Sequence, residues 1–149
     1  MAYCADTNIL LRWVQPATDA SQIARGAVEA LHLKGEAVYI TPQNLVEFWT
    51  VATRPADVNG LGMTVQQAEA ELQQIEALFP LLPDTSAIHA EWRKLIICSG
   101  VSGVRTHDAR LASALRVHGV SHILTFNVAD CKSFGQPIPV NPRNVTKNP

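Results

Sequence analysis

The sequence contains little cysteine, no excess of either charge and no long apolar run. Its cysteines, Cys4, Cys98 and Cys131, are far apart and form no CxxC pair, which argues against a disulfide framework or a zinc site and favours reduced thiols in a cytoplasmic protein. The formal net charge of -1 offers no basic field for nucleic acid or an anionic membrane, although a metal ion can supply positive charge locally. Apolar runs such as "LIIC" are much too short to cross a bilayer.

Several motifs of common enzyme classes are also absent. Neither glycine-rich phosphate loop, GxGxxG or GxxxxGK(S/T), occurs, so a nucleotide-binding fold of that kind is disfavoured. GxSxG and HExxH are missing too, which argues against serine-hydrolase and zincin chemistry. Any catalytic chemistry must therefore come from other residues.

What is present is an alternation of short apolar segments with longer amphipathic ones, in 149 residues with the composition of a globular domain. Apolar and β-branched runs predict strands at 2–5, 37–41, 121–125 and 138–140. Capped amphipathic segments predict helices at 6–14, 19–35, 41–54, 64–80, 84–100 and 106–119. The predicted caps include Asp19 with Gln22, Thr41 before Pro42, and a capping box of Thr64 and Gln67. Residues 126–135 are expected to be rich in turns. The alternation predicts an α/β fold, a parallel sheet flanked by helices, in a single compact domain over 1–141 with a flexible polar tail over 142–149.

Three aspartates occur where predicted strands end or helices begin. Asp6 directly follows the first strand, Asp130 lies in the segment after the third, and Asp108 opens a helix. The carboxyl ends of parallel strands meet at one edge, where open α/β sheets bind ligands, so Asp6 and Asp130 are expected there. Asp108 reaches the same edge if the loop before it crosses the top of the sheet. Taken singly, each aspartate also fits a helix or turn cap, which is the commoner role.

Glu47 is an acid in an apolar context, in the middle of "NLVEFW", and it is not at a cap position. An uncompensated buried carboxylate is costly or has a raised pKa. Helical spacing places Glu47 on a mainly polar stripe with Asn44 and Thr50. That stripe is either the wet face of a surface helix or the lining of a cleft, and its composition favours a cleft.

Four acid-bearing segments occur in an order and spacing that match a known family. They are "CADTNILL", "PQNLVEFW" followed by "TRP", "THDARLASA" and "ILTFNVADC". Each is weakly specific alone, but together the chain resembles the PIN-domain ribonucleases, in particular the VapC-like toxins of toxin–antitoxin pairs. The resemblance implies a PIN-like, Rossmann-like fold and a Mg²⁺- or Mn²⁺-dependent endoribonuclease that leaves a 3′-hydroxyl and a 5′-phosphate. It also implies an RNA substrate, a small antitoxin partner and a homodimer.

Carried over to this sequence, the resemblance implies that the catalytic and metal-binding residues are Asp6, Glu47, Asp108 and Asp130. Many family members have an aspartate at the position of Asn127, so we interpret Asp130 as the fourth acid and Asn127 as a neutral helper. Asn8 and Thr125 are expected to add hydrogen bonds around the acids, although a turn or cap role fits each of them too. Cys131 replaces a common aromatic residue, which affects packing more than chemistry.

A site made only of carboxylates suits Mg²⁺ or Mn²⁺, which prefer oxygen ligands, better than zinc. Two carboxylates about 6 Å apart repel by roughly 3 kcal/mol at an effective dielectric constant of ~20, so without metal their pKa values should rise. Metal affinity should accordingly fall in acid. The basic residues near the acidic motifs in sequence are candidates for RNA contact, although each also fits a solvated surface charge. They are Arg12, Arg105, His107 and Arg110.

Two other interpretations stay open at the level of sequence. A phosphoaspartyl phosphatase-type enzyme would use Asp6 as its nucleophile, but the second aspartate expected two residues later is Asn8. A catalytically degenerate PIN fold would be a binding module without activity. Asn127 leaves room for that interpretation, whereas the intact acids at positions 6, 47 and 108 argue against it.

Overall fold

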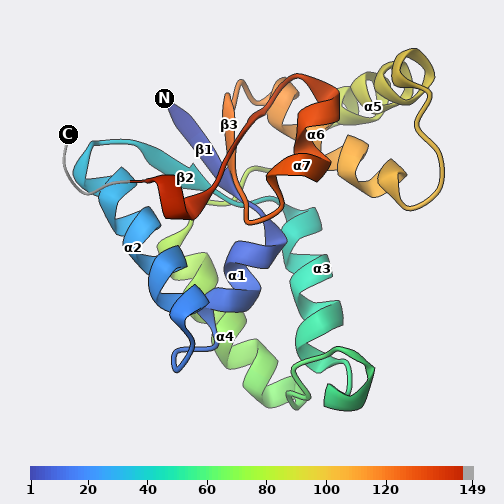
Figure 1. The fold of residues 1–149 in the computed structure, drawn as a ribbon. Coiled ribbons are helices and arrows are strands. Elements are labelled where there is room, and N and C mark those ends of the chain that lie inside the picture. The colour runs from blue at the N-terminus through green and yellow to red at the C-terminus, as the bar shows by residue number, and fades with distance from the viewer. Residues whose placement is uncertain (146–149) are drawn as a thin grey trace.

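Four parallel strands form the central sheet of the computed structural model, which describes residues 1–145 (Figure 1). The strands are β1 (Ala2–Ala5), β2 (Ala37–Tyr39), β3 (His122–Leu124) and β4 (Ile138–Val140). Their order across the sheet is β2-β1-β3-β4, and every neighbouring pair is parallel. The predicted α/β fold with a parallel sheet is therefore confirmed.

Helices fill the connections between the strands. In the described part of the chain they are α1 (Thr7–Trp13), α2 (Asp19–Leu33), α3 (Pro42–Thr53), α4 (Val65–Leu78), α5 (Ser86–Ser99), α6 (Arg105–Val117) and α7 (Val128–Cys131). The predicted cap Thr41 precedes α3, and the predicted capping box of Thr64 and Gln67 starts α4. None of these helices within residues 1–145 is long and apolar enough to span a lipid bilayer.

Three local details differ from the sequence-based expectation. Thr18, rather than Asp19, caps α2 by accepting a hydrogen bond from the backbone N–H of Ser21. Helix α6 begins at Arg105, so Asp108 lies within its first turn instead of opening it. The segment expected to be rich in turns contains the short helix α7 and the 3-10 helix η2 (Lys132–Phe134).

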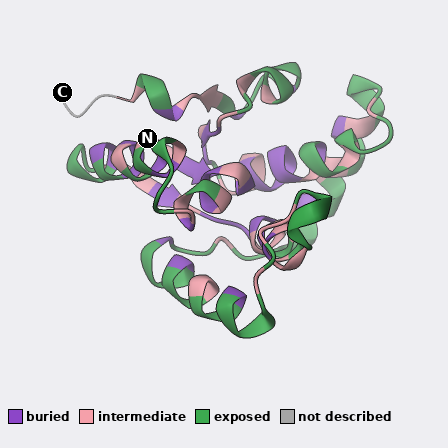
Figure 2. Ribbon diagram, turned by 60° about the horizontal axis from the view of Figure 1, so that its bottom comes forward, coloured by how far each residue is buried: buried purple, intermediate pink, exposed green. Residues whose placement is uncertain are grey.

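Helices cover both faces of the sheet. Successive side chains of a strand point to opposite faces, so Tyr3 and Ala5 of β1 join the larger core beside α1 to α4, whereas Cys4 joins a second core with Leu111 and Leu115 of α6. Helix α5 packs on α6. Figure 2 shows that buried residues gather on the strands and on the helix faces turned toward them. Burial on both faces explains why the strands are apolar throughout.

The 3-10 helix η3 (Pro142–Asn144) packs against α2. Pro142 is buried, and the Asn141 side chain accepts a hydrogen bond from the backbone N–H of Arg143 at 2.9 Å. The sequence predicts a flexible tail over 142–149. Residues 142–145 of that segment contact the domain in this way, and residues 146–149 lie outside the described residues.

The carboxyl end of β1 lies where the order of the strands reverses. The chain proceeds from β1 to β2 on one side, while β3 and then β4 lie on the other. Ligands of open α/β sheets bind at such a point, beyond the carboxyl ends of the strands. The segments that leave the sheet there contain Asp6 after β1, Thr41 after β2 and Thr125 after β3.

Candidate active site

Asp6 caps α1 at the carboxyl end of β1. Its Oδ1 accepts a hydrogen bond from the backbone N–H of Thr7 at 2.8 Å, and its Oδ2 accepts one from the Thr125 hydroxyl at 2.8 Å. Asn8 Nδ2 lies 3.5 Å from the same Oδ2 and donates a shorter bond of 3.0 Å to the Thr125 hydroxyl. Asp6 is therefore both a helix cap and a side chain held in place from the loop after β3.

Burial raises the pKa of Asp6 from 3.8 to about 6. Removal from water is the largest cause, and the hydrogen bonds from Thr125 and Thr7 partly offset it. The negative charges of Glu47 and Asp108 raise the pKa further. Acids from three separate segments therefore act on one another at this edge of the sheet.

Glu47 is half-buried on α3, and both of its carboxylate oxygens are hydrogen-bonded. Oε2 accepts from the Thr7 hydroxyl at 2.9 Å, and Oε1 accepts from Gln43 Nε2 at 2.8 Å. Thr7 also binds Asp6 through its backbone, so one residue joins the two acids. Each carboxylate oxygen retains capacity for a further interaction. These bonds compensate for part of the solvation that Glu47 loses.

The rest of the predicted polar stripe on α3 divides between the interior and the surface. Asn44 is fully buried, and its Oδ1 accepts hydrogen bonds from the Thr41 backbone N–H and hydroxyl, each at 2.9 Å. Its Nδ2 donates to the Thr7 hydroxyl at 3.3 Å. Thr50 is exposed and donates to a carbonyl of its own helix. Asn44 thus supports the site from within, so the expectation that it lines a cleft was wrong.

Asp108 lies in the first turn of α6. Partial burial raises its pKa, and the negative charges of Glu47 and Asp130 add to the rise. The nearby positive charges of Arg105 and His107 lower the pKa of Asp108 in part. The pKa of Asp108 is therefore raised by both Glu47 and Asp130.

Asp130 is exposed on α7, at the margin of the acidic group. Its charge acts on Asp108 and Cys131 and is not among the charges that act on Asp6. Asn127 has an exposed side chain, and only its backbone N–H reaches the site, by donating to the Thr125 hydroxyl at 3.0 Å. Within residues 1–145, no three His, Cys, Asp or Glu side chains come close enough to hold one ion directly.

Cys131 forms part of the wall of a small cavity between Asp6 and Asp108 that is otherwise lined mostly by apolar side chains. Burial, followed by the negative charges of these two aspartates and of Asp130, raises the pKa of Cys131 to about 12. The thiol therefore stays protonated at neutral pH and is a poor nucleophile there.

The basic residues near the acidic motifs differ in their exposure and in their hydrogen bonds. Arg12 and His107 are exposed. Arg105 donates to a backbone carbonyl of α7 at 2.8 Å. Arg110 is half-buried and donates to Gln43 Oε1 at 3.2 Å. The guanidinium groups of Arg105 and Arg110 therefore form hydrogen bonds within the protein.

Sequence reasoning missed Thr7 and Gln43 as parts of the site. Thr7 follows Asp6 directly, and Gln43 lies one helical turn before Glu47, so the spacing on α3 was the available signal. The contact of Thr7 with Glu47 spans 40 residues and has no counterpart in local sequence.

The chain as a whole is similar to proteins of a known family. The PIN domain model matches residues 3–129. No curated protein sequence matches the chain. Among solved structures, VapBC2 of Rickettsia felis, bound to promoter DNA, matches with a TM-score of 0.72 at 18% identity, covering 95% of this chain and 98% of that one.

Two further structures match over most of the chain. VapBC-1 of nontypeable Haemophilus influenzae has a TM-score of 0.69 at 15% identity, covering 95% of this chain and 98% of that one. VapC20 of Mycobacterium tuberculosis has a TM-score of 0.57 at 14% identity, covering 81% and 86%. At these identities the likeness concerns the fold. Since the family model spans most of the sequence, the chain belongs to the PIN domain family.

Proposed function

We propose that this protein is a metal-dependent endoribonuclease that hydrolyses RNA phosphodiester bonds, and that it is the toxin of a toxin–antitoxin pair. The observation that carries the proposal is the meeting of Asp6, Glu47 and Asp108, from three segments, at one edge of the sheet. The raised pKa values of Asp6 and Asp108 mean that their ionised forms are unfavourable in the metal-free fold. Packing therefore does not explain their convergence, whereas a cation does.

The residues present fit Mg²⁺ or Mn²⁺. The donor atoms are carboxylate oxygens, which these ions prefer, and the hydrogen bonds that orient Asp6 and Glu47 are typical of metal-binding carboxylates. The acids lie too far apart for three direct ligands, which suits Mg²⁺, since it keeps several waters beside one or two carboxylates. Asp6 and Asp108 would hold the ion directly or through water. Asp130 would complete the site or hold a second ion.

When bound, such an ion supplies positive charge for the phosphate and lowers the pKa of coordinated water. The protein contributes placement. Asn8 and Thr125 hold Asp6, and the backbone N–H of Asn127 supports the Thr125 hydroxyl. Glu47, held on both oxygens, would orient the attacking water.

The relatives support the choice of substrate and partner. VapC20 is described as a toxin that cleaves the sarcin–ricin loop, which supports RNA as the substrate class. VapBC2 and VapBC-1 support assembly with a small antitoxin, and a homodimer is expected. The exposed residues Arg12 and His107 would contact the RNA backbone, where salt-dependent binding is expected.

An RNA cleavage assay tests the proposal. Purified wild-type protein, Asp6→Asn and Asp108→Asn are compared on RNA with Mn²⁺ or Mg²⁺ and with chelator. Metal-dependent cleavage by the wild type alone, with 5′-phosphate products, is the expected result. Asp57→Asn, an exposed aspartate of the 3-10 helix η1 (Ala56–Val58), is the matched control and should cleave normally.

Other outcomes select the remaining interpretations. Equal background activity in every variant would leave a PIN fold that binds without cleaving. Trapping of an acyl phosphate on Asp6 would instead indicate a phosphoaspartyl enzyme. Asp130→Asn tests whether Asp130 completes the site. If it does, this variant should lose nearly as much activity as Asp108→Asn.

A further inference from the structure

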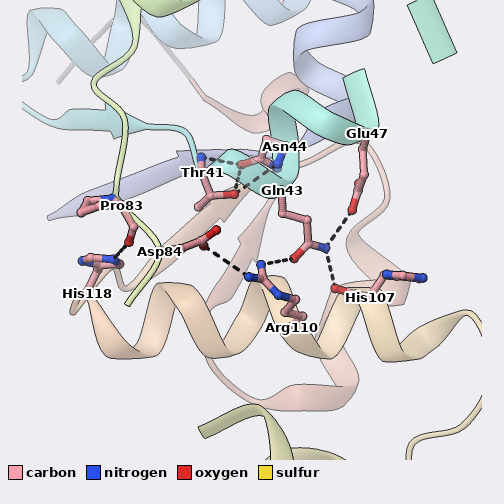
Figure 3. Close-up of polar contacts among 9 residues, drawn as sticks. All are labelled: Thr41, Gln43, Asn44, Glu47, Pro83, Asp84, His107, Arg110 and His118. Atoms are coloured by element: carbon pink, nitrogen blue, oxygen red, sulfur yellow. Dashed lines mark hydrogen bonds and ion pairs between the residues drawn. The ribbon is translucent and has the colours of Figure 1, made fainter. Parts of the chain in front are cut away.

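The Gln43 side chain connects two parts of the acidic site. Its amide Nε2 donates to Glu47 Oε1 at 2.8 Å and to the backbone carbonyl of His107 at 2.7 Å (Figure 3). His107 immediately precedes Asp108 in the first turn of α6, and its imidazole points away from Gln43. One amide group thus spans from the carboxylate on α3 to the helix turn that carries another acid.

Three partners fix the way this amide faces, and Arg110 is the one that contacts its oxygen. Its Nη1 donates to Gln43 Oε1 at 3.2 Å, and its Nη2 lies 3.4 Å from Asp84 Oδ1 (Figure 3). A flipped amide would turn its oxygen toward the Glu47 carboxylate and the His107 carbonyl, and its NH₂ toward the guanidinium. Every one of these contacts would then be unfavourable, since acceptors would face acceptors and donors a donor.

We propose that Gln43 is a positioning residue, whose amide holds the Glu47 carboxylate at a fixed position relative to the helix turn of Asp108. Arg110 acts through Gln43, because its bond to the amide oxygen helps to fix the orientation of the amide. The inference rests on the proposed function and adds to it a part of the site outside the acids. It also assigns Arg110 to the support of the site, in place of the contact with RNA expected from sequence.

The geometry explains why the side chain must be glutamine. Both amide hydrogens are used, one on each side of the gap between α3 and α6, and the oxygen is used by the guanidinium. Apolar side chains of similar length provide none of these bonds. Groups that orient metal-binding carboxylates typically contribute on the order of ten- to a hundredfold to metal affinity or activity.

Variants Gln43→Met, Arg110→Met and the double variant test the inference. Mn²⁺ binding is measured by calorimetry without RNA, and RNA cleavage gives kcat, the KM for RNA and the salt dependence. Gln43→Met should weaken Mn²⁺ binding or lower kcat by on the order of tenfold or more, with the KM for RNA unchanged. Arg110→Met should change the same quantities less. The double variant should match Gln43→Met within about twofold, because Arg110 acts through Gln43.

Matched controls are Gln74→Met on α4 and Arg93→Met on α5, both exposed residues, which should behave as wild type. Arg110→Met leaves Gln43 in place, so it tests the inference even if Gln43→Met does not fold. Wild-type values in both single variants would overturn the inference. So would additive losses with a raised KM for RNA and a salt slope reduced by about one, since these indicate a direct contact of Arg110 with phosphate.

Failure of the proposed function gives a different result. A wild-type protein that binds Mn²⁺ without cleaving RNA contradicts the nuclease, while the calorimetric comparison of the variants still decides the role of Gln43. A wild-type protein that neither binds Mn²⁺ nor cleaves RNA contradicts both.

Discussion

Replacing Asp6 with asparagine should stabilise the metal-free protein at neutral pH while it abolishes RNA cleavage. The rise in the pKa of Asp6 from 3.8 to about 6 corresponds to about 3 kcal/mol against the ionised form, because one pKa unit is worth roughly 1.4 kcal/mol. Asparagine is neutral, but its NH₂ group replaces the acceptor of the Thr125 hydroxyl, which offsets roughly 1 kcal/mol. The net gain is about 2 kcal/mol, or roughly 4 to 8 °C in Tm.

The sign of the pH dependence follows from the raised pKa. The folded protein holds the Asp6 proton up to about pH 6, whereas the unfolded chain releases it near 3.8. The contribution of Asp6 to stability is therefore complete below the lower value and is lost as the pH rises through about 6. At about pH 4.5 the cost of ionisation falls to roughly 1 kcal/mol, so the advantage of Asp6→Asn should disappear.

Urea denaturation in the presence of chelator, at about pH 7.5 and about pH 4.5, measures this difference. Asp57→Asn, which removes an exposed carboxylate, is the control and should change stability little at either pH. The reasoning is refuted if Asp6→Asn is less stable than the wild type at about pH 7.5. An equal advantage at both pH values would refute it as well, because ionisation would then not be the cause.

Three further predictions concern the same region. Mn²⁺ affinity, measured by calorimetry, should fall about tenfold per pH unit below about 6, since the ion must displace the Asp6 proton; a flat profile contradicts this. Asn44→Ala should lower the free energy of unfolding by about 2 to 4 kcal/mol in urea melts, because several buried hydrogen bonds are lost; a change below about 1 kcal/mol would show that they contribute little. Iodoacetamide at about pH 8 should alkylate exposed Cys98 well before Cys131, whose pKa of about 12 keeps it protonated, and mass spectrometry showing the reverse order would contradict that environment.

Local signals in the sequence predicted the elements because they act over a few residues. The Thr41 cap with Pro42 and the Thr64–Gln67 box each satisfy backbone groups within one turn, and these predictions are confirmed. The cap of α2 was misassigned because Thr18 and Asp19 are adjacent and both residue types cap helices well. The start of α6 was placed too late, because the N-cap residue is Val104. Its side chain forms no capping hydrogen bond, so the sequence offered no signal there.

The acids were identifiable from sequence because their order and spacing along the chain are themselves sequence properties. The strand-end positions of Asp6 and Asp130 predicted one edge of the sheet, and the resemblance to the family added Glu47 and Asp108. The structure brings Asp6, Glu47 and Asp108 within electrostatic reach of one another. Asp130 was less predictable, because its position depends on α7, and its charge acts on Asp108 but is not among those that act on Asp6.

By itself, therefore, the sequence determined the α/β alternation, the caps of α3 and α4 and which carboxylates could form a site. Only the tertiary structure decided what holds those carboxylates. The hydroxyl of Thr7 reaches Glu47 across 40 residues, and Gln43 reaches His107 across 64. Such contacts depend on how α1, α3 and α6 are packed on the sheet, and hydrogen bonds of this length tolerate only small displacements. No local pattern in the chain encodes that packing.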